Sequence, residues 1–142
     1  MYTINEGTID LPDEWKDQSI NVVSANGGGA GMTFTITRDQ IPWGMDFFEY
    51  VEGELKQAGE ALTKFTVLTK KSLTICGVDA VEIECTWKAK QGDMNQIITT
   101  VNAPTGAMVL TASQQGPLSD KQKAEVRRIT SSLNFKPQED VA

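Results

Sequence analysis

The stretch of residues 33–48 joins a strand pattern, a turn and a helix start without interruption, and this continuity constrains the fold more than any other feature of the chain. Threonine alternates with apolar residues at 33–37, which is the period-two pattern of a strand with two different faces. A charged pair and a Pro-Trp-Gly segment then break the strand. We expect a helix to follow directly, with Asp46 near its N-cap and its end at about Leu62. The stretch therefore predicts a sheet tied through a short loop to an amphipathic helix.

Apolar residues at helical spacing predict two main helices. The first is interrupted by Gly53 and Gly59, each of which costs roughly 1 kcal/mol relative to alanine in a helix interior. The second is predicted to open at Ser119, because Gln122 follows three residues later at the spacing of a capping box. The apolar stripes are Phe48, Val51, Leu55 and Leu62 in the first helix, and Val126, Ile129 and Leu133 in the second.

Alternating and β-branched segments predict the strands of a sheet. We expect them at 2–11 as one or two short strands around Gly7, then at 19–24, 32–37, 65–68, 72–75, 81–87, 94–101 and 108–113, with a last short one at 134–136. These strands cluster before and between the helices instead of alternating with them. The expected fold class is therefore α+β: a twisted antiparallel sheet of about six strands packed with two main helices.

The charge balance limits the kinds of partner. The chain has 142 residues, with 13 Lys and Arg against 19 Asp and Glu and a net charge of −6. Nucleic acids and anionic membrane surfaces are recognised by clustered cations, so we expect neither a nucleic-acid partner nor a stable membrane association. The length fits one domain. We expect residues 1–142 to form it, with 136–142 as a frayed polar tail.

The sequence shows no recognisable targeting or membrane-spanning segment. The first residues lack a basic region followed by an apolar run, and no segment approaches ~20 apolar residues. We therefore expect a cytoplasmic protein. In a reducing compartment, Cys76 and Cys85 are expected to remain two buried free thiols, although their spacing would permit a disulfide.

The sequence offers few of the residue types that catalysis and metal binding usually require. The chain contains no histidine, which removes the usual general base, the commonest metal ligand and the Ser-His-Asp and Cys-His arrangements. Glu82 and Glu84 share one strand face and would be available as an acid–base pair, but a solvated face or an intersubunit ion pair is the favoured interpretation. We expect no enzyme activity, no cofactor and no metal.

Three other motifs have ordinary interpretations. The basic pairs at 70–71 and 127–128 are expected to be solvated, as short basic pairs in acidic proteins usually are. The glycines at 27–31 lead into a strand and lack the lysine or helix that a phosphate-binding loop requires. We expect them to form a flexible connector.

The sheet faces offer the alternative of a binding site. Ile20 and Val22 share one face of their strand, and Ile36 lies in the strand expected beside it. If the helices cover only one sheet face, these residues belong to an exposed apolar strip, which usually marks a partner site. If both faces are covered they belong to the core, and the sequence alone favours that alternative. Gln57 and Gln96 are ordinary surface residues unless they line such a groove, where an amide both donates and accepts.

Several segments, taken in order, resemble a known family. They are Asn5-Glu6-Gly7-Thr8-Ile9-Asp10-Leu11-Pro12 followed by Trp15, Phe34-Thr35-Ile36-Thr37-Arg38-Asp39, Glu54-Leu55-Lys56-Gln57, Val81-Glu82-Ile83-Glu84 with Trp87, the strand around Gln96, and Gly116-Pro117-Leu118-Ser119. On these segments nearly the whole chain resembles a DcrB-like domain, and specifically the Eag chaperones encoded beside effectors of the bacterial type VI secretion system. None of the segments is a catalytic signature.

The resemblance implies both a fold and a function. It implies a sandwich of the PsbP-like type that forms a homodimer and binds the hydrophobic N-terminal transmembrane segments of an effector, keeping them soluble before loading on the secretion spike. It also implies a groove for these segments. The residues carried over to the groove are Ile20, Val22, Ile36, Gln57, Ala61 and Gln96. The alternative from another class is a non-catalytic module that binds a small ligand or a protein with the same fold.

Overall fold

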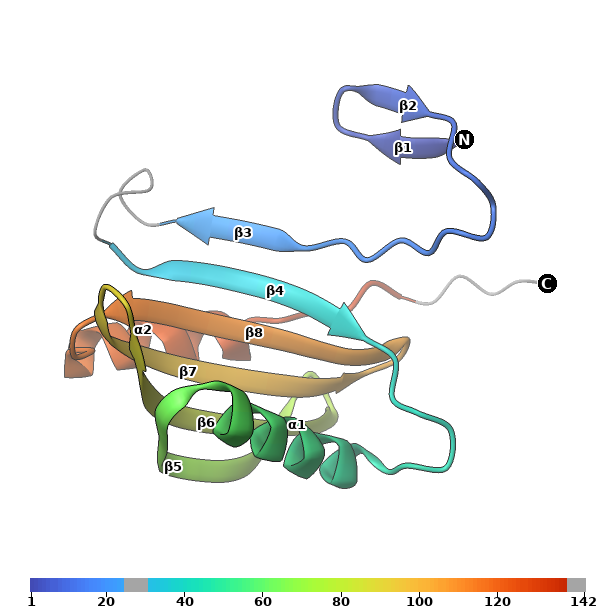
Figure 1. Ribbon diagram of the computed structural model, residues 1–142. Helices are drawn as coiled ribbons and strands as arrows, with labels where there is room; N and C mark the ends of the chain where they lie inside the picture. Colours follow the sequence, from blue (N-terminus) through green and yellow to red (C-terminus); the bar gives the residue numbers. More distant parts are fainter. Residues whose placement is uncertain (25–30, 138–142) are drawn as a thin grey trace.

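The computed structural model describes residues 1–24 and 31–137 of the chain. The predicted glycine-rich connector at 27–31 and the predicted tail at 136–142 lie mainly outside these residues. The described part contains two helices and two antiparallel sheets, one of two strands and one of six (Figure 1).

The six-stranded sheet has the order β3-β4-β8-β7-β6-β5, and every neighbouring pair is antiparallel. Its strands are β3 (Asn21–Ser24), β4 (Thr33–Asp39), β5 (Thr63–Ile75), β6 (Val78–Ala89), β7 (Gly92–Ala103) and β8 (Gly106–Gln115). A separate hairpin consists of β1 (Tyr2–Ile4) and β2 (Gly7–Ile9). The helices are α1 (Phe47–Ala61) and α2 (Asp120–Ser131). The predicted α+β class, with about six antiparallel strands and two main helices, is confirmed.

The two helices begin where their capping residues predict. The side chain of Asp46 accepts a hydrogen bond from the backbone N–H of Glu49 at 3.0 Å, which satisfies one of the free donors at the start of α1. At α2, Ser119 and Gln122 form the predicted capping box, with the two bonds at 3.1 and 2.9 Å. Both N-termini are therefore fixed by local sequence.

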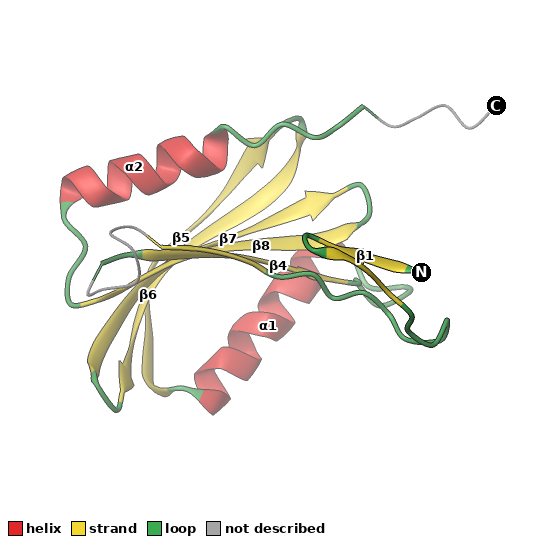
Figure 2. Ribbon diagram, turned by 90° about the horizontal axis from the view of Figure 1, so that it is seen from above, coloured by secondary structure: helices red, strands yellow, loops and turns green. Residues whose placement is uncertain are grey.

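The helices lie on opposite faces of the sheet (Figure 2). On one face, Phe47, Tyr50 and Val51 of α1 pack with Val81, Ile83 and Cys85 of β6. On the other, Leu118 and Val126 pack with Ile97 of β7 and Ala112 of β8. Because side chains alternate along a strand, the register assigns each strand residue to the α1 face or to the α2 face.

Three predicted elements differ in the structure. The two strands predicted at 65–68 and 72–75 are one continuous strand, β5, in which two register shifts interrupt the alternation. Residues 134–136 form no strand, and the half-buried Phe135 instead packs against the core cluster that contains Val101 and Leu110. Strand β6 was expected to be half-buried, but both of its faces are buried between Ala80 and Cys85.

One glycine controls how the β7–β8 hairpin meets the end of β4. Gly106 has φ +142°, and a Cβ atom on it would stand 2.7 Å from the carbonyl oxygen of Asp39. Only glycine fits this approach. The end of β4, where the chain turns towards α1, is therefore held closely against β8.

Candidate functional site

The α1 face of the sheet is only partly covered by α1. The helix lies over the β5–β6 side of the sheet, and its partners in the core come mainly from β6 (Figure 1). Ile98 of β7 and Ala107 of β8 still pack in the α1 core cluster, but beyond them no described helix covers β3, β4 or the neighbouring parts of β7 and β8 on this face. We call this region the open face. Its side chains, placed by the strand register, are Val22, Thr33, Thr35, Thr111, Ser113 and Gln96.

One flank of α1 borders the open face. The hydroxyl of Tyr50 donates to Oδ2 of Asp39 at the end of β4, at 2.8 Å. On the opposite flank, Glu52 pairs with Lys70 of β5. Gln57 and Ala61 follow Tyr50 at helical spacing and are exposed, so they lie on the flank directed towards β4.

The same flank includes a glycine, which has no side chain to fill the adjacent space. Gly53 precedes Gln57 by one turn, and a Cβ atom on it would meet nothing within 4 Å. The flank thus offers glycine, glutamine and alanine in succession along one helix side, which leaves room for a bound segment beside α1.

Five of the six predicted groove residues lie on or beside the open face. Val22 is 64% exposed on the open face, and Gln96 is half-buried in its floor. Gln57 and Ala61 lie on the bordering flank of α1. Ile20 is 61% exposed and directly precedes β3, at the period-two spacing from Val22.

Ile36 does not share this surface. The register pairs Val22 with Thr35 and Asn21 with Ile36, so Ile36 points to the α2 face. There it packs in the core cluster that contains Val101 and Leu110. A one-residue offset in register moves a side chain to the other face of a sheet. The prediction that Ile36 lines the same groove as Val22 is therefore wrong.

Gln96 belongs to a hydrogen-bonded chain that crosses three strands. The indole Nε1–H of Trp87 donates to its Oε1 at 2.9 Å, and its Nε2 donates to Oγ of Ser113 at 2.9 Å. The thiol of Cys85 also lies 3.9 Å from Oε1. Because an indole nitrogen can only donate, it fixes which end of the amide faces Trp87. The sequence analysis did not connect Trp87 and Ser113 with Gln96, because only the register of β6, β7 and β8 places the three side chains on one face.

Glu82 and Glu84 lie on the α2 face and are buried, with exposures of 1% and 7%. Glu82 is paired with Arg127 and Lys71, each at 3.3 Å. Glu84 pairs with Lys123 at 3.2 Å and with Arg127 at 3.5 Å. The prediction of a solvated or intersubunit pair of carboxylates is therefore wrong. In the basic pairs, Lys70, Lys71 and Arg128 are exposed as predicted, and only Arg127 is half-buried. These ion pairs fasten α2 to the sheet and leave neither carboxylate open to a substrate.

The two cysteines have different environments and are both free thiols. Cys85 is buried, and burial raises the pKa of its thiol to about 11, which keeps it protonated and unreactive. Cys76 is exposed in the turn between β5 and β6, so the prediction of two buried thiols holds only for Cys85. The described residues bring together no group of three or more potential metal ligands. They also include no helix that is long and apolar enough to cross a membrane.

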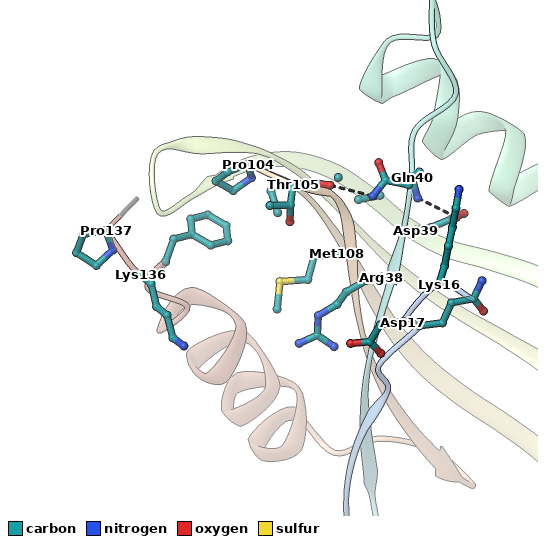
Figure 3. Close-up of a pocket in the computed structure, with 15 residues that line it drawn as sticks. Lys16, Asp17, Arg38, Asp39, Gln40, Pro104, Thr105, Met108, Lys136 and Pro137 are labelled. Carbon is teal, nitrogen blue, oxygen red and sulfur yellow. Dashed lines mark hydrogen bonds between the residues drawn. The ribbon is translucent and has the colours of Figure 1, made fainter. Parts of the chain in front are cut away.

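A second concavity lies away from the open face. It has a volume of about 610 Å³ and is formed by residues 16–18, 38–40, 103–108 and 135–137 (Figure 3). Arg38 within it donates to the backbone carbonyl of Ser19 at 3.1 Å. Hydrogen bonds from Ser19 and Tyr2 lower the pKa of Asp17, which is also attracted by Arg38. Its charged groups are therefore partly engaged with one another.

Comparisons with known proteins identify the family of this chain and a solved structure with the same fold. The family model DcrB matches residues 6–132. A protein of Pseudomonas aeruginosa described as Effector EagT6 is 30% identical over 96 residues, which are 66% of this chain and 67% of that protein. The crystal structure of PA94, a Pseudomonas aeruginosa protein of unknown function, superposes with a TM-score of 0.79. That match covers 96% of each chain at 23% identity, so it concerns the fold alone.

Proposed function

The chain belongs to the DcrB family, and from this premise we propose that it is a chaperone or adaptor for an effector of a type VI secretion system. The resemblance to the Eag proteins inferred from the sequence is confirmed by the match to EagT6. In this proposal the protein binds hydrophobic N-terminal transmembrane segments of its effector, keeps them soluble and aids their loading on the secretion spike.

The observation that carries the proposal is the open face beside α1. A transmembrane helix in water exposes large aliphatic side chains, and each one removed from water contributes roughly 1.5–3 kcal/mol. The exposed Ile20 and Val22 at the border of the open face supply apolar surface for these side chains, and the threonines on its floor add methyl groups. A helix satisfies its own backbone hydrogen bonds, so a trough with few polar contacts is sufficient.

The proposal also covers the location and the oligomeric state of the chaperone. We propose that it is cytoplasmic and acts as a homodimer. Val22 and Val23 expose opposite faces of the edge strand β3 at 64% and 61%, which supports a partner at this end of the sheet. The net charge of −6 favours the solubility of a complex that carries an apolar client.

We propose binding rather than catalysis. The chain has no histidine, and the buried pair Glu82 and Glu84 is engaged by three cations. The raised pKa of Cys85 also disfavours a nucleophilic thiolate. Release of the client is then expected from competition or assembly.

One specific observation favours a second candidate function. The concavity of about 610 Å³ falls within the size range of small-molecule sites, which supports a module that binds a small ligand with the same fold. Such a module would not keep an effector segment soluble.

The proposal is tested by co-expression with the N-terminal segment of the toxin encoded beside it, followed by size-exclusion chromatography with light scattering. A soluble complex of one client segment with two copies of this chain is expected. A monomer with the client left insoluble would contradict the chaperone function and favour the small-ligand module.

Two matched variants of β3 test whether the client binds to the open face. Val22→Asp places a charge on the open face, whereas Val23→Asp places it on the opposite face of the same strand at nearly equal exposure. We expect Val22→Asp, like Ile20→Asp, to abolish client solubility while the fold survives. Val23→Asp is expected to leave it intact, and equal effects of both valine variants would reject the open face as the site.

A further inference from the structure

The turn between β4 and α1 displays the most exposed aromatic side chain in the described part of the chain. Trp43 is 102% exposed, and Met45 and Phe48, which follow it closely in the sequence, are exposed as well. We call these three residues the Trp43 patch. The turn projects beyond the end of β4 (Figure 1). Because an aromatic side chain contributes a large apolar area when it is covered, a fully exposed indole near two other apolar side chains indicates a contact with a partner.

The turn holds the backbone of Trp43 in one conformation. The backbone N–H of Met45 donates to the carbonyl of Pro42 at 3.0 Å, and Gly44 has φ +82°, which residues with a side chain rarely adopt. Before the turn, Ile41 packs against the core cluster between α1 and β6. After it, the capped N-terminus of α1 begins. Since the turn is closed by a hydrogen bond and fixed at both ends, a partner that covers Trp43 orders little additional backbone.

Two carboxylates lie next to the patch. Asp46 is the N-cap of α1, and its Oδ1 accepts from the backbone N–H of Glu49 in the first helical turn at 3.0 Å. A hydrogen bond with Asp46 and then repulsion by its charge raise the pKa of Glu49. Among residues 1–24 and 31–137, no cation forms an ion pair with either carboxylate. The turn is therefore followed by two negative charges that a cation of a partner can neutralise.

Phe48 places part of the patch on the side of α1 that is directed away from the open face. Residues four positions apart share one side of a helix, so Phe48 lies one turn before Glu52 on the same flank. Glu52 pairs with Lys70 of β5, on the flank opposite the one that borders the open face. A partner bound at Phe48 therefore approaches α1 from the β5 side.

We propose that the Trp43 patch is a second binding surface, which receives an arginine flanked by apolar residues on another protein. The planar guanidinium stacks on the indole of Trp43, and its N–H groups pair with the carboxylate of Asp46 or Glu49. The apolar neighbours of the arginine contact Met45 and Phe48. This contact is separate from the open face, so the chain can hold a client there while it binds a further protein.

The composition of the patch favours arginine on a protein over other occupants. Tryptophan and arginine are both enriched among the residues that dominate the binding energy of protein interfaces. The ammonium of lysine has no planar group to stack on an indole. An anionic membrane surface is disfavoured, because it repels the two carboxylates beside the indole and a chain with a net charge of −6.

The test uses two short synthetic peptides with a fluorescent label. One carries an arginine between two leucines, and the other carries citrulline at that position, which keeps the planar side chain but has no charge. Anisotropy titration with the full chain is expected to show about fivefold tighter binding of the arginine peptide, as one cation–π contact and one exposed ion pair together provide. Fluorine NMR of the chain labelled with fluorotryptophan locates the contact, because the signal of Trp43 should shift while those of Trp15 and Trp87 stay in place.

Two pairs of matched variants test the side chains of the patch. Trp43→Ala is expected to bring the affinity ratio of the two peptides close to one, whereas Trp15→Ala, at another exposed tryptophan, should keep it. Glu49→Gln removes one of the two charges and should lower the ratio about twofold, whereas Glu60→Gln near the other end of α1 should not. Since all four side chains are exposed, the melting curves of the variants by circular dichroism should match that of the wild type.

The outcomes separate this surface from other uses of the patch and from client binding. Equal affinity for the two peptides, or a fluorine shift at Trp15 alone, would overturn the proposal. Binding of the chain through Trp43 to vesicles of phosphatidylcholine and phosphatidylglycerol would assign the patch to a membrane and also overturn it. A change in the mass of the chain in light scattering on Trp43→Ala would do the same in favour of a second copy.

Co-expression with the effector segment distinguishes this inference from the proposed function. Trp43→Ala is expected to keep the client soluble, and a loss of client solubility in this variant would overturn the separation of the patch from the open face. Failure of the wild type to keep the client soluble would contradict the proposed function alone, because the peptide titrations do not depend on it.

Discussion

The hydroxyl of Tyr50 donates a hydrogen bond to Oδ2 of Asp39 at 2.8 Å and thereby joins α1 to the end of β4. Tyr50 is 5% exposed, and its ring packs in the core between α1 and the sheet. The bond therefore fixes the position of the helix flank that borders the open face. Loss of this bond should loosen the site as well as the fold.

Tyr50→Phe removes the hydroxyl and keeps the ring. Because a hydrogen bond to a charged group contributes more than a neutral one, we expect the free energy of unfolding to fall by about 1–2 kcal/mol. Urea unfolding followed by circular dichroism measures this change. Tyr2→Phe removes the exposed hydrogen bond to Asp17 and should change stability by less than ~0.5 kcal/mol. Equal losses in the two variants would contradict a special role for the α1 contact.

The same residue predicts a pH dependence. Burial and then the hydrogen bond to Asp39 raise the pKa of Tyr50 above its ordinary value of 10.0. Above pH ~10 the unfolded chain releases this proton while the folded chain retains it, so stability falls as the pH rises. The wild type should therefore lose more stability than Tyr50→Phe between neutral pH and pH ~11. Parallel pH profiles of the two proteins would contradict the raised pKa.

Adjacent arginines on α2 pair with carboxylates that differ in burial. Arg127 pairs with the buried carboxylates Glu82 and Glu84, whereas Arg128 pairs with the exposed Glu125. Arg127→Met leaves Glu82 with Lys71 alone in a buried site, and we expect a loss of roughly 2–4 kcal/mol in the free energy of unfolding. Arg128→Met should cost less than ~1 kcal/mol, as exposed pairs do.

A double variant that removes both charges of the Arg127–Glu82 pair tests the same explanation. When Glu82→Leu accompanies Arg127→Met, no unpaired charge of that pair remains in the interface. A buried ion pair replaced by apolar residues is often neutral in stability, so the double variant should recover most of the loss. A double variant as unstable as the sum of the single ones would contradict this account of the network. Chemical denaturation of all four proteins gives the comparison.

Local signals in the sequence predicted much of this fold. The N-cap at Asp46 and the capping box at Ser119 depend on neighbouring residues, and both are confirmed. The ion pairs of Glu82 were not predictable, since they join β6 to residues of β5 and α2 that are distant in sequence. Alternation alone marks two faces of β6 but does not reveal that α2 covers the charged one.

The candidate site shows the same division. Val22 and Gln96 could be placed on one sheet face only through the register of β3, β4, β8 and β7. The sequence sets the spacing within each strand and leaves the offset between strands open. For this reason Ile36 was assigned to the groove, although it points to the α2 face.

The position of Ile36 has a measurable consequence. Ile36→Ala removes apolar atoms that pack in the core with Val101 and Leu110, so we expect a loss of about 2 kcal/mol in the free energy of unfolding. Val22→Ala, at an exposed position, should cost less than ~0.5 kcal/mol. In the client assay the order reverses, because only Val22 borders the open face. A larger stability loss for Val22→Ala would reject this assignment of faces.

Gly53 allows stability and client binding to be separated on α1. A Cβ atom at this position meets nothing within 4 Å, so Gly53→Ala should stabilise the helix by about 0.5–1 kcal/mol through its higher helix propensity. Gly53→Trp places a bulky ring on the flank that borders the open face, where it would occupy the space proposed for the client. We expect a folded protein that no longer keeps the client soluble. Lys56→Trp, on the outward side of the same helix, is the control and should retain client binding. If Gly53→Trp binds the client as well as Lys56→Trp does, the client does not lie against this flank of α1.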